Sequence, residues 1–509
     1  MHNSIITQNR KWWILSTMTA TISMIFIDIT VLPVALPTLQ RELGFSDLGL
    51  QWAINIYTLV LAVLVLAGGR LGDMWGLKKA FCFGLIVFAV ASAACGFSQK
   101  EWWFIFSRAL QGLGGAFLIP ATQGIIAAHF PPHQRGRASG IYVSIGSVFL
   151  AFGPLIGGTL TSYLSWRYVF WINLPIAAIG FLMALFIVPS MKGKKETFDM
   201  RGFLILVLGL SGVIIGLMQA QNWGWLSIPT LSFLSIGSFF LCFLFHRKHK
   251  KHATLIDFAL IRKKSFIASI SVIFCIQLLA MVTVFWAIYF QNILGFSPSK
   301  AGLFSFAANI PVFFMAPVSG FLVDRFGPRL PVTIGFGLII FALSGFLIFS
   351  HLPNVWLLIP TLLLFGSGSP LIFTPSFVAL RNATSATNQG IVSGTAATFR
   401  QFGATLGLTL FGTIYTSTFL GKLGKSLQEN STLSSLDPTQ FEGLLSKSPQ
   451  ALHALGELSS SNANYVLDAA REAFLKGFSY INILATIVAL IGMIIALRLL
   501  KNTPAHREK

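Results

Sequence analysis

Long apolar runs dominate this sequence, and each run ends at a polar or Gly/Pro turn. A transmembrane helix needs about 20 consecutive apolar residues to cross the roughly 30 Å hydrocarbon layer of a bilayer. Fourteen runs reach this length, at approximately residues 12–36, 50–69, 79–97, 103–128, 138–163, 168–189, 200–219, 226–245, 265–294, 299–323, 330–350, 354–379, 388–418 and 477–498. The pattern predicts an all-α integral membrane protein with 14 transmembrane helices.

The residue composition agrees with a lipid environment, because 54% of the residues are hydrophobic and only 10% are charged. The first run is longer than the apolar core of a cleavable signal peptide and carries Asp28 and two prolines. We therefore expect this run to stay in the membrane as the first helix.

The net charge of +20 raises the possibility of nucleic-acid binding, and the positions of the 36 Lys and Arg residues argue against it. With the N-terminus in the cytoplasm, 26 of them fall in cytoplasmic termini, loops and helix ends, Arg381 and Arg400 among them. Nine fall in external loops, and Arg108 lies within a run. This asymmetry is typical of topology set by positive charge. It predicts a multi-pass protein of the cell (inner or plasma) membrane with both termini cytoplasmic.

The sequence gives no sign of a metal or cofactor site. The segment HRKHKKH at 246–252 alternates histidine with cations that would repel a metal ion, and a basic cytoplasmic loop is the better interpretation. The four cysteines, Cys82, Cys95, Cys242 and Cys275, are scattered singly through apolar runs and lack ligand spacing. No Walker A sequence or other nucleotide-binding motif is present either.

An internal repeat divides the chain. GRLGDMWG at 69–76 and GFLVDRFG at 320–327 share the pattern Gly-x-Leu-x-Asp-x-x-Gly, 251 residues apart. Repeats of this kind are typical of transporters. The repeat predicts two pseudo-symmetric six-helix halves, 1–189 and 265–509, with two inserted helices and a basic cytoplasmic loop between them at 190–264.

One long polar segment interrupts the second half at about 421–476. Its five basic residues are balanced by six acidic ones. We interpret it as an external loop, with short helices around PQALHALGEL and NYVLDAAREAF and no feature of a catalytic site. The chain is not expected to be an enzyme.

Seven motifs follow one another along the chain: DITVLPVALP at 28–37, GRLGDMWGLKK at 69–79, RALQGLGGA at 108–116, GPLIGG at 153–158, WRYVFWINLP at 166–175, YFQNILGFSPSKAG at 289–302 and FRQFGATLG at 399–407. In this order they resemble the 14-helix drug:proton antiporter branch of the major facilitator superfamily, whose members include multidrug resistance exporters. Pro33 stands where that branch usually has Asn, and Met74 and Leu77 replace its usual basic residues.

This resemblance implies roles for two sets of residues. The gating loops would be a latch that stabilises an outward-facing state, with simple helix capping as the alternative; their residues are Gly69, Asp73, Gly76, Lys78, Lys79, Gly320, Asp324, Arg325 and Gly327. The antiporter motif would leave one face of its helix bare for a sliding, leak-tight contact between the halves, with ordinary helix packing as the alternative; its residues are Gly153, Pro154, Gly157 and Gly158.

Asp28 is the one acidic residue predicted to lie deep in hydrocarbon. A charge at the centre of a membrane helix costs roughly 2.5–3.5 kcal/mol on insertion scales, which argues for a function. By helical rise, Asp28 lies about 12 Å and Arg108 about 8 Å from the outer ends of their runs. The hypothesis is that Asp28 carries a proton and Arg108 modulates its release; the alternative is a permanent structural ion pair.

Polar and amphipathic residues inside the runs are candidates for lining a substrate path, because such groups usually face the bundle interior. They are Asn55, Tyr57, Gln123, Gln277, Trp286, Tyr289 and Asn309.

The predicted function is a proton-coupled antiporter that exports lipophilic drugs or toxic compounds, cationic ones among them, by alternating access. The alternatives are a dedicated exporter or an uptake symporter for one metabolite, or a non-transporting receptor. The expected partners are the small-molecule substrate, protons and the lipid bilayer, without nucleic acid, and no accessory efflux protein can be named from the sequence.

Overall fold

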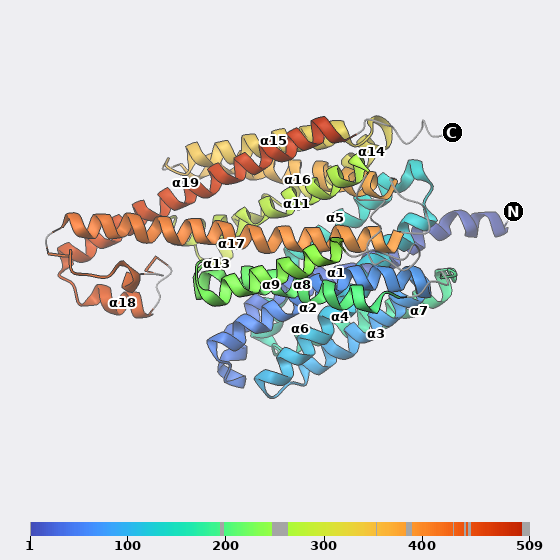
Figure 1. The fold of residues 1–509 in the computed structure, drawn as a ribbon, viewed down its shortest axis with the longest axis horizontal. Helices are drawn as coiled ribbons and strands as arrows, with labels where there is room; N and C mark the ends of the chain where they lie inside the picture. Colours follow the sequence, from blue (N-terminus) through green and yellow to red (C-terminus); the bar gives the residue numbers. More distant parts are fainter. Residues whose placement is uncertain are drawn as a thin grey trace.

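The computed structural model describes residues 2–193, 198–246, 263–352, 354–382, 389–430, 432–441, 444–445 and 449–500. These residues form helices, and no strand occurs among them (Figure 1). The predicted basic loop lies largely outside the described residues. The described part of the chain is therefore all-α, as the apolar runs predict.

The helices follow the predicted runs closely. The first half contains α1 (His2–Leu43), α2 (Asp47–Trp75), α3 (Leu77–Gly96), α4 (Glu101–His129), α5 (Pro132–Tyr163), α6 (Tyr168–Trp171) and α7 (Asn173–Ile187). The inserted pair is α8 (Met200–Trp223) and α9 (Ile228–His246). The second half contains α11 (Lys264–Ala280), α12 (Val282–Asn292), α13 (Pro298–Phe306), α14 (Ile310–Phe326), α15 (Arg329–Phe349), η1 (Val355–Leu357), α16 (Leu358–Asn382), α17 (Gln389–Glu429), η3 (Pro438–Phe441), α18 (Pro449–Gly456) and α19 (Ser460–Leu499).

Twelve helical segments in the described residues are long and apolar enough to cross a membrane. The other two predicted runs are also helical, but α9 has a shorter apolar part at Ile228–Leu244, and α17 is interrupted by many Gly, Thr and Ser residues. The count of 14 crossings therefore stays a prediction.

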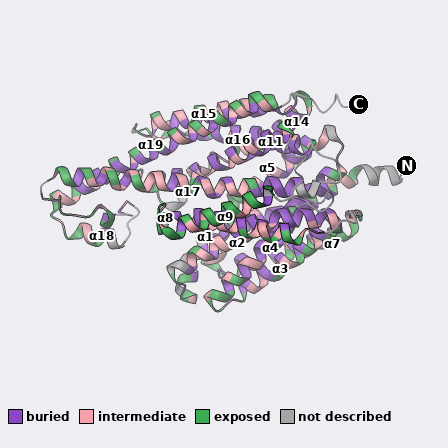
Figure 2. Cartoon of the chain, in the orientation of Figure 1, coloured by how far each residue is buried: buried purple, intermediate pink, exposed green. Residues whose placement is uncertain are grey.

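Most buried residues of the two predicted halves fall in separate clusters, although Ala397 of α17 packs with the first. Helices α1 and α4 are the most buried apolar segments of residues 1–189 (Figure 2). The inserted helix α8 packs against α2 and α17, and α9 packs on α8 through a close crossing at Gly212 and Gly237. Small residues let membrane helices approach in this way. Helix α17 thus lies beside helices of both halves.

The repeated pattern has the same backbone conformation in each half. Gly76 ends α2 with φ of 96°, and Gly327 ends α14 with φ of 77°. Positive φ is strained for residues that carry a Cβ, so the last glycine of the pattern is required for the turn. These turns lie at the end of the bundle where α1 begins and α19 ends, which we call the termini end (Figure 1).

The polar segment predicted as a loop at 421–476 is mostly helical. Helix α17 continues to Glu429, α19 already begins at Ser460, and the two extend beyond the bundle together with η3 and α18 (Figure 1). We call the described residues of 420–476 the protrusion. Its interior contains the buried residues Leu423, Leu427, Leu433, Phe441, Leu444, Ala451, Val466 and Ala470. The two short helices predicted from PQALHALGEL and NYVLDAAREAF are present as α18 and the start of α19, and buried residues of the turns and of η3 pack between the helices.

Replacing Phe441 with Ala is expected to destabilise the protrusion by about 3–5 kcal/mol, because it opens a cavity among buried side chains. Limited proteolysis of the purified protein should then cut within 420–476 more rapidly. The matched control is Gln440→Ala, which alters an exposed neighbour. Equal cleavage rates for the two variants would contradict a folded core.

Candidate functional site

A buried ion pair joins two helices of the first half. Arg108 of α4 and Asp28 of α1 lie 2.6 Å apart, between Nη1 and Oδ2, and only 2% and 1% of the two residues are exposed. The depths estimated from the sequence agree with this contact. Since a buried charge is tolerated only when it is paired and hydrogen-bonded, the pair requires further polar partners.

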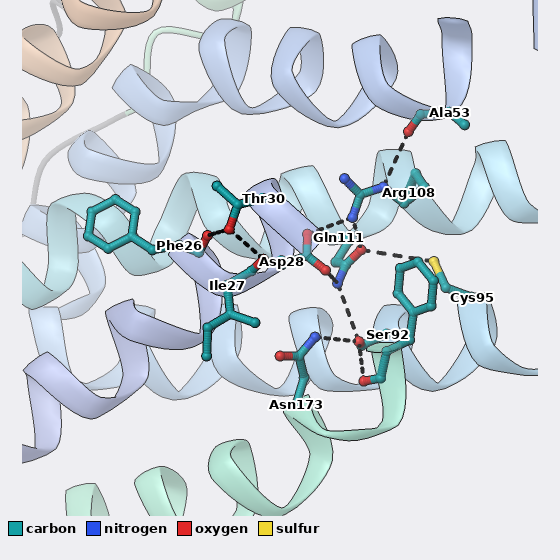
Figure 3. A network of polar contacts seen from close by, with 11 residues as sticks. Phe26, Ile27, Asp28, Thr30, Ala53, Ser92, Cys95, Arg108, Gln111 and Asn173 are labelled. Carbon is teal, nitrogen blue, oxygen red and sulfur yellow. Dashed lines mark hydrogen bonds and ion pairs between the residues drawn. The ribbon is translucent and has the colours of Figure 1, made fainter. Parts of the chain in front are cut away.

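Gln111, one turn after Arg108, supplies those partners (Figure 3). Its Nε2 donates to Asp28 Oδ1 at 2.8 Å, and its Oε1 accepts from Arg108 Nη1 at 2.6 Å. Arg108 Nε also donates to the backbone oxygen of Ala53 of α2 at 3.3 Å. Both carboxylate oxygens of Asp28 are thus satisfied, and sequence reasoning missed Gln111 although it lies on the same helix face as Arg108.

The network continues away from the pair into α3 and α7 (Figure 3). Gln111 Nε2 donates to Ser92 Oγ at 3.3 Å, and Asn173 Nδ2 donates to the same oxygen at 3.0 Å. Ser92 in turn donates to the backbone oxygen of Phe170 at 2.8 Å. A chain of hydrogen bonds therefore connects α1, α4, α3 and the α6–α7 segment.

Tyr57 of α2 covers the other side of Arg108. The guanidinium carbon lies 4.5 Å from the centre of the Tyr57 ring, a cation–π contact. The Tyr57 side chain is buried, and its hydroxyl has no hydrogen-bond partner among the described residues. Tyr57 is one of the predicted lining residues, and the structure places it directly beside the ion pair.

Glycines in the RALQGLGGA motif bring these helices together. A Cβ at Gly112 would meet the backbone of Tyr57, and one at Gly114 would meet the backbone of Phe88 of α3. Because α4 lacks side chains here, α2 and α3 approach closely enough to enclose the ion pair.

Among the predicted gating residues, Asp324 makes a contact between the halves. Its carboxylate accepts the backbone N–H groups of Gly136 at 3.2 Å and Arg137 at 3.3 Å, near the start of α5. Beside it, Gly320 of α14 lies so close to Gly136 that a Cβ on either would meet the backbone of the other. The second copy of the repeat thus fastens α14 to α5.

The first copy of the repeat behaves differently. Lys78 donates to the backbone oxygens of Leu185 at 2.8 Å and Val188 at 2.7 Å, at the end of α7. Asp73 is buried at the end of α2, Lys79 and Arg325 are exposed, and Gly69 is buried. Lys78 therefore supports packing within the first half, because the partial negative charge at the C-terminus of α7 favours a nearby cation.

The antiporter motif does not make the contact between halves that we expected. Gly153 packs against Thr30 and Gly157 against Val31, both on α1 of the same half. At 100° per residue, these glycines lie on a different face of α5 from Gly136 and Gly140, which do meet α14. Gly158 is half-buried, and the Pro154 side chain lies outside the described residues.

The predicted lining residues separate into distinct places. Gln123 joins Ser139, Tyr142 and Arg381 around a cavity of about 20 Å³ between α4, α5 and α16. Asn309 lines a groove of about 300 Å³ between α5 and α13–α14, with Phe152, Phe306, Phe313 and Phe314.

The remaining lining candidates do not join these two places. Trp286 stacks on Phe346 at 4.2 Å and Tyr289 on Phe478 at 4.9 Å, so both are core residues of the second half, contrary to expectation. Asn55 and Gln277 are half-buried.

Two arginines that were assigned to cytoplasmic helix ends are not at the protein surface, since Arg381 is buried and Arg400 is half-buried. Arg381 of α16 is buried and donates to Gln123 Oε1 at 3.1 Å and Ser139 Oγ at 3.5 Å, on helices of the other half. Arg400 lies roughly 16 Å along α17 from its start and is half-buried. The sequence did indicate that Arg400 lies within a helix, because residue 400 falls inside the predicted run 388–418. Counting Lys and Arg by loop hid this.

The described residues contain no group of three or more His, Cys, Asp or Glu that could hold a metal ion. Cys82, Cys95, Cys242 and Cys275 are free thiols.

Comparisons with known proteins agree with this architecture. A family model described as Major Facilitator Superfamily matches residues 18–408. The crystal structure of the human organic anion transporter MFSD10 (TETRAN) superposes with a TM-score of 0.61 at 13% identity, covering 94% of this chain and 99% of that one. At this identity the likeness concerns the fold alone.

Curated bacterial proteins are similar over most of the sequence. Multidrug resistance protein Stp of Mycobacterium tuberculosis is 29% identical over 402 residues, 77% of this chain and 73% of its own length. The tetracenomycin C resistance and export protein of Streptomyces glaucescens is 28% identical, covering 98% of this chain and 94% of its own. The methyl viologen resistance protein SmvA of Salmonella typhimurium is 29% identical, covering 92% and 94%.

Proposed function

Since the chain belongs to the major facilitator superfamily, we propose that it exports lipophilic drugs or toxic compounds in exchange for protons, by alternating access. It is a multi-pass membrane protein, and the names of its relatives are consistent with the drug:proton antiporter branch. The proposal places it in the cell membrane with both termini in the cytoplasm.

The export part of the proposal is supported by the relatives. Three proteins that align with most of this chain are named for resistance to drugs or for export. The groove at Asn309 agrees with lipophilic substrates, because its volume reaches the lower range of small-molecule pockets and its lining is largely phenylalanine.

The observation that carries proton coupling is the buried Asp28–Arg108 pair. A carboxylate in contact with a guanidinium is held in its ionised form, whereas a buried carboxylate without that partner is protonated. Any movement that separates α1 from α4 would therefore load Asp28 with a proton, and its reversal would release the proton. Gln111 holds both groups and keeps the pair aligned in the present conformation.

Alternating access requires that the termini end open and close. In the present conformation this end is held by Asp324 on α5, by the Gly136–Gly320 crossing and by Arg381 on Gln123. These contacts join one half to the other through a few hydrogen bonds and through the close packing of glycines on α5 and α14. They can therefore break and re-form without rearranging either core.

The proposal is tested with purified protein in liposomes that carry an imposed pH gradient. Ethidium, a lipophilic monovalent cation, should be moved against its own gradient. When ethidium is added outside the vesicles, each cation that enters the lumen should be exchanged for a proton that leaves it, so protons should appear on the side of addition. Ethidium movement without proton movement would contradict antiport. Growth assays with several unrelated compounds separate a multidrug exporter from a dedicated one, since only the former protects cells against more than one.

A further inference from the structure

The cavity beside Arg381 is enclosed by buried side chains of both halves. It lies between α4 and α5 of the first half and α16 of the second, and seven of the nine described residues that line it are buried. Among these nine residues, Arg381 is the one charged side chain, and none is acidic. The described lining of the cavity therefore contains a permanent positive charge and no negative one.

Neutral groups orient the guanidinium of Arg381. It donates to Gln123 Oε1 at 3.1 Å and to Ser139 Oγ at 3.5 Å, and its central carbon lies 5.9 Å from the centre of the Phe377 ring. These contacts hold the guanidinium at the wall of the cavity, but none of them supplies a negative charge. An anion in the cavity would offset the cost of keeping this charge away from water.

Thr374 of α16 contributes a hydroxyl to the same cavity. The residue is only 1% exposed, and its Oγ1 has no hydrogen-bond partner among the described residues. A helical threonine can donate to the carbonyl oxygen one turn earlier, which here belongs to Pro370. That oxygen accepts from Ser319 Oγ at 2.8 Å instead. Because an unpaired buried hydroxyl is costly, a ligand that accepts its proton is favoured.

Ser139 of α5 contributes a second hydroxyl, from the other half. Its Oγ accepts from Arg381, and no hydrogen bond found among the described residues uses its own proton. A hydroxyl that accepts a hydrogen bond can still donate one. The cavity therefore offers an acceptor one cation and two hydroxyl donors.

The size of the cavity limits what can fill it. Its volume is about 20 Å³, and a site of roughly 10–15 Å³ holds one water molecule. This is too small for the carboxylate of a drug-sized compound or for a lipid phosphate, and it agrees with a single ion slightly larger than water. Chloride is such an ion, and it accepts hydrogen bonds from guanidinium and hydroxyl groups alike. A water molecule would satisfy the hydroxyls but would bring no negative charge.

We propose that the cavity is a chloride-binding site, in which the ion is held by Arg381 and by the hydroxyls of Ser139 and Thr374. The site goes beyond the proposed export function and does not depend on it. Ser139 comes from the first half and the other two residues from the second, so the complete site exists only while α5 and α16 lie together. Bound chloride therefore stabilises the conformation in which the termini end is closed.

Thermal unfolding of the full-length protein in detergent tests the site, with sodium gluconate replaced stepwise by sodium chloride at constant ionic strength. A ligand that binds only the folded protein raises the unfolding temperature as its concentration rises. Wild type should show this rise. Arg381→Gln should weaken chloride binding by about 10- to 100-fold, the value of a hydrogen bond to a charged group. Broadening of the chloride NMR signal measures the binding independently of unfolding.

Thr374→Val keeps the proposal testable if Arg381→Gln does not fold. Valine has nearly the same shape as threonine but no hydroxyl. In gluconate this variant should be at least as stable as wild type, because the unpaired hydroxyl is gone. Its affinity for chloride should be about 2- to 10-fold weaker, the value of a neutral hydrogen bond.

The matched control is Thr361→Val, which removes another buried hydroxyl of α16. Thr361 is 2% exposed, donates to the backbone oxygen of Leu358 at 2.6 Å and does not line the cavity. This variant should keep the chloride response of wild type. It also keeps every surface cation, so it accounts for general effects of chloride on a basic protein.

An equal chloride response in wild type, Arg381→Gln and Thr374→Val would mean that the cavity holds water only, and would overturn the site. Repeating the titration with acetate examines the other anion chemistry. If acetate stabilises the protein in a manner that depends on Arg381 and Thr374, and chloride does not, the assignment to chloride is wrong. Neither measurement involves ethidium transport, so failure of export would leave the chloride site intact, and loss of the chloride response would leave the export proposal intact.

Discussion

Asp28→Asn is expected to abolish proton-driven export. Asparagine keeps the shape of the side chain but cannot exchange a proton, so substrate movement loses its connection to the pH gradient. With one proton exchanged per monovalent substrate, a pH difference of one unit supports a substrate ratio of about tenfold across the membrane. In the variant this ratio should fall to one. The measurement is ethidium accumulation in liposomes at several imposed pH gradients.

A folding defect has to be separated from a loss of coupling. Asp28→Asn leaves Arg108 buried without its carboxylate, and breaking a buried pair in this way costs about 3–5 kcal/mol. The double variant Asp28→Asn with Arg108→Gln removes both charges and should recover most of that stability, as judged by thermal unfolding. It should remain uncoupled. Gradient-driven accumulation in the double variant would reject Asp28 as the proton carrier.

Gly320→Ala is expected to open the termini end. The added Cβ would meet the backbone of Gly136, which cannot rotate away as a side chain can, so α14 and α5 must separate. Overpacking of this kind costs about 1–3 kcal/mol. Since only the closed conformation bears this cost, the equilibrium should shift towards the open one by about 5- to 150-fold.

Site-resolved maleimide labelling measures this shift. A cysteine introduced at Ser139, which is buried beside Arg381 in the closed conformation, should react faster when Gly320 is Ala. The control is Gly337→Ala on α15, where a Cβ would meet nothing within 4 Å. Identical rates in the two backgrounds would mean that the α5–α14 crossing does not hold the termini end closed.

Much of the fold could be predicted because each transmembrane helix is encoded by a local run of apolar residues. Apolar runs located the helices, and the repeat located equivalent turns at Gly76 and Gly327. The Asp28–Arg108 contact was within reach because helical rise alone sets the depth of a residue.

The remaining features depend on which helix faces which, and a single sequence does not encode this locally. The glycines of GPLIGG could not be assigned to α1 rather than to the other half without the packing of α5. Arg400 was assigned to a cytoplasmic helix end because charge was counted by loop, although the predicted run 388–418 contains it. In the protrusion, the two short helices predicted at PQALHALGEL and NYVLDAAREAF are present as α18 and the start of α19, whereas the extension of α17 to Glu429 was not predicted.

The length of α17 has a mechanical consequence. This helix of 41 residues is about 60 Å long, touches both halves within the bundle, and is held at its far end by packing against α19 and by the Lys422–Glu472 ion pair. It therefore acts as a lever whose fulcrum lies between the halves. With the pivot near residue 400, where α17 contacts α2 and α11, Glu429 lies about 44 Å further along, and a tilt of about 10° would move it by about 8 Å. A protein that binds the tip of the protrusion would be sensitive to the conformational state although it stays outside the membrane. By holding the tip in one position, it would also keep the transporter in one conformation.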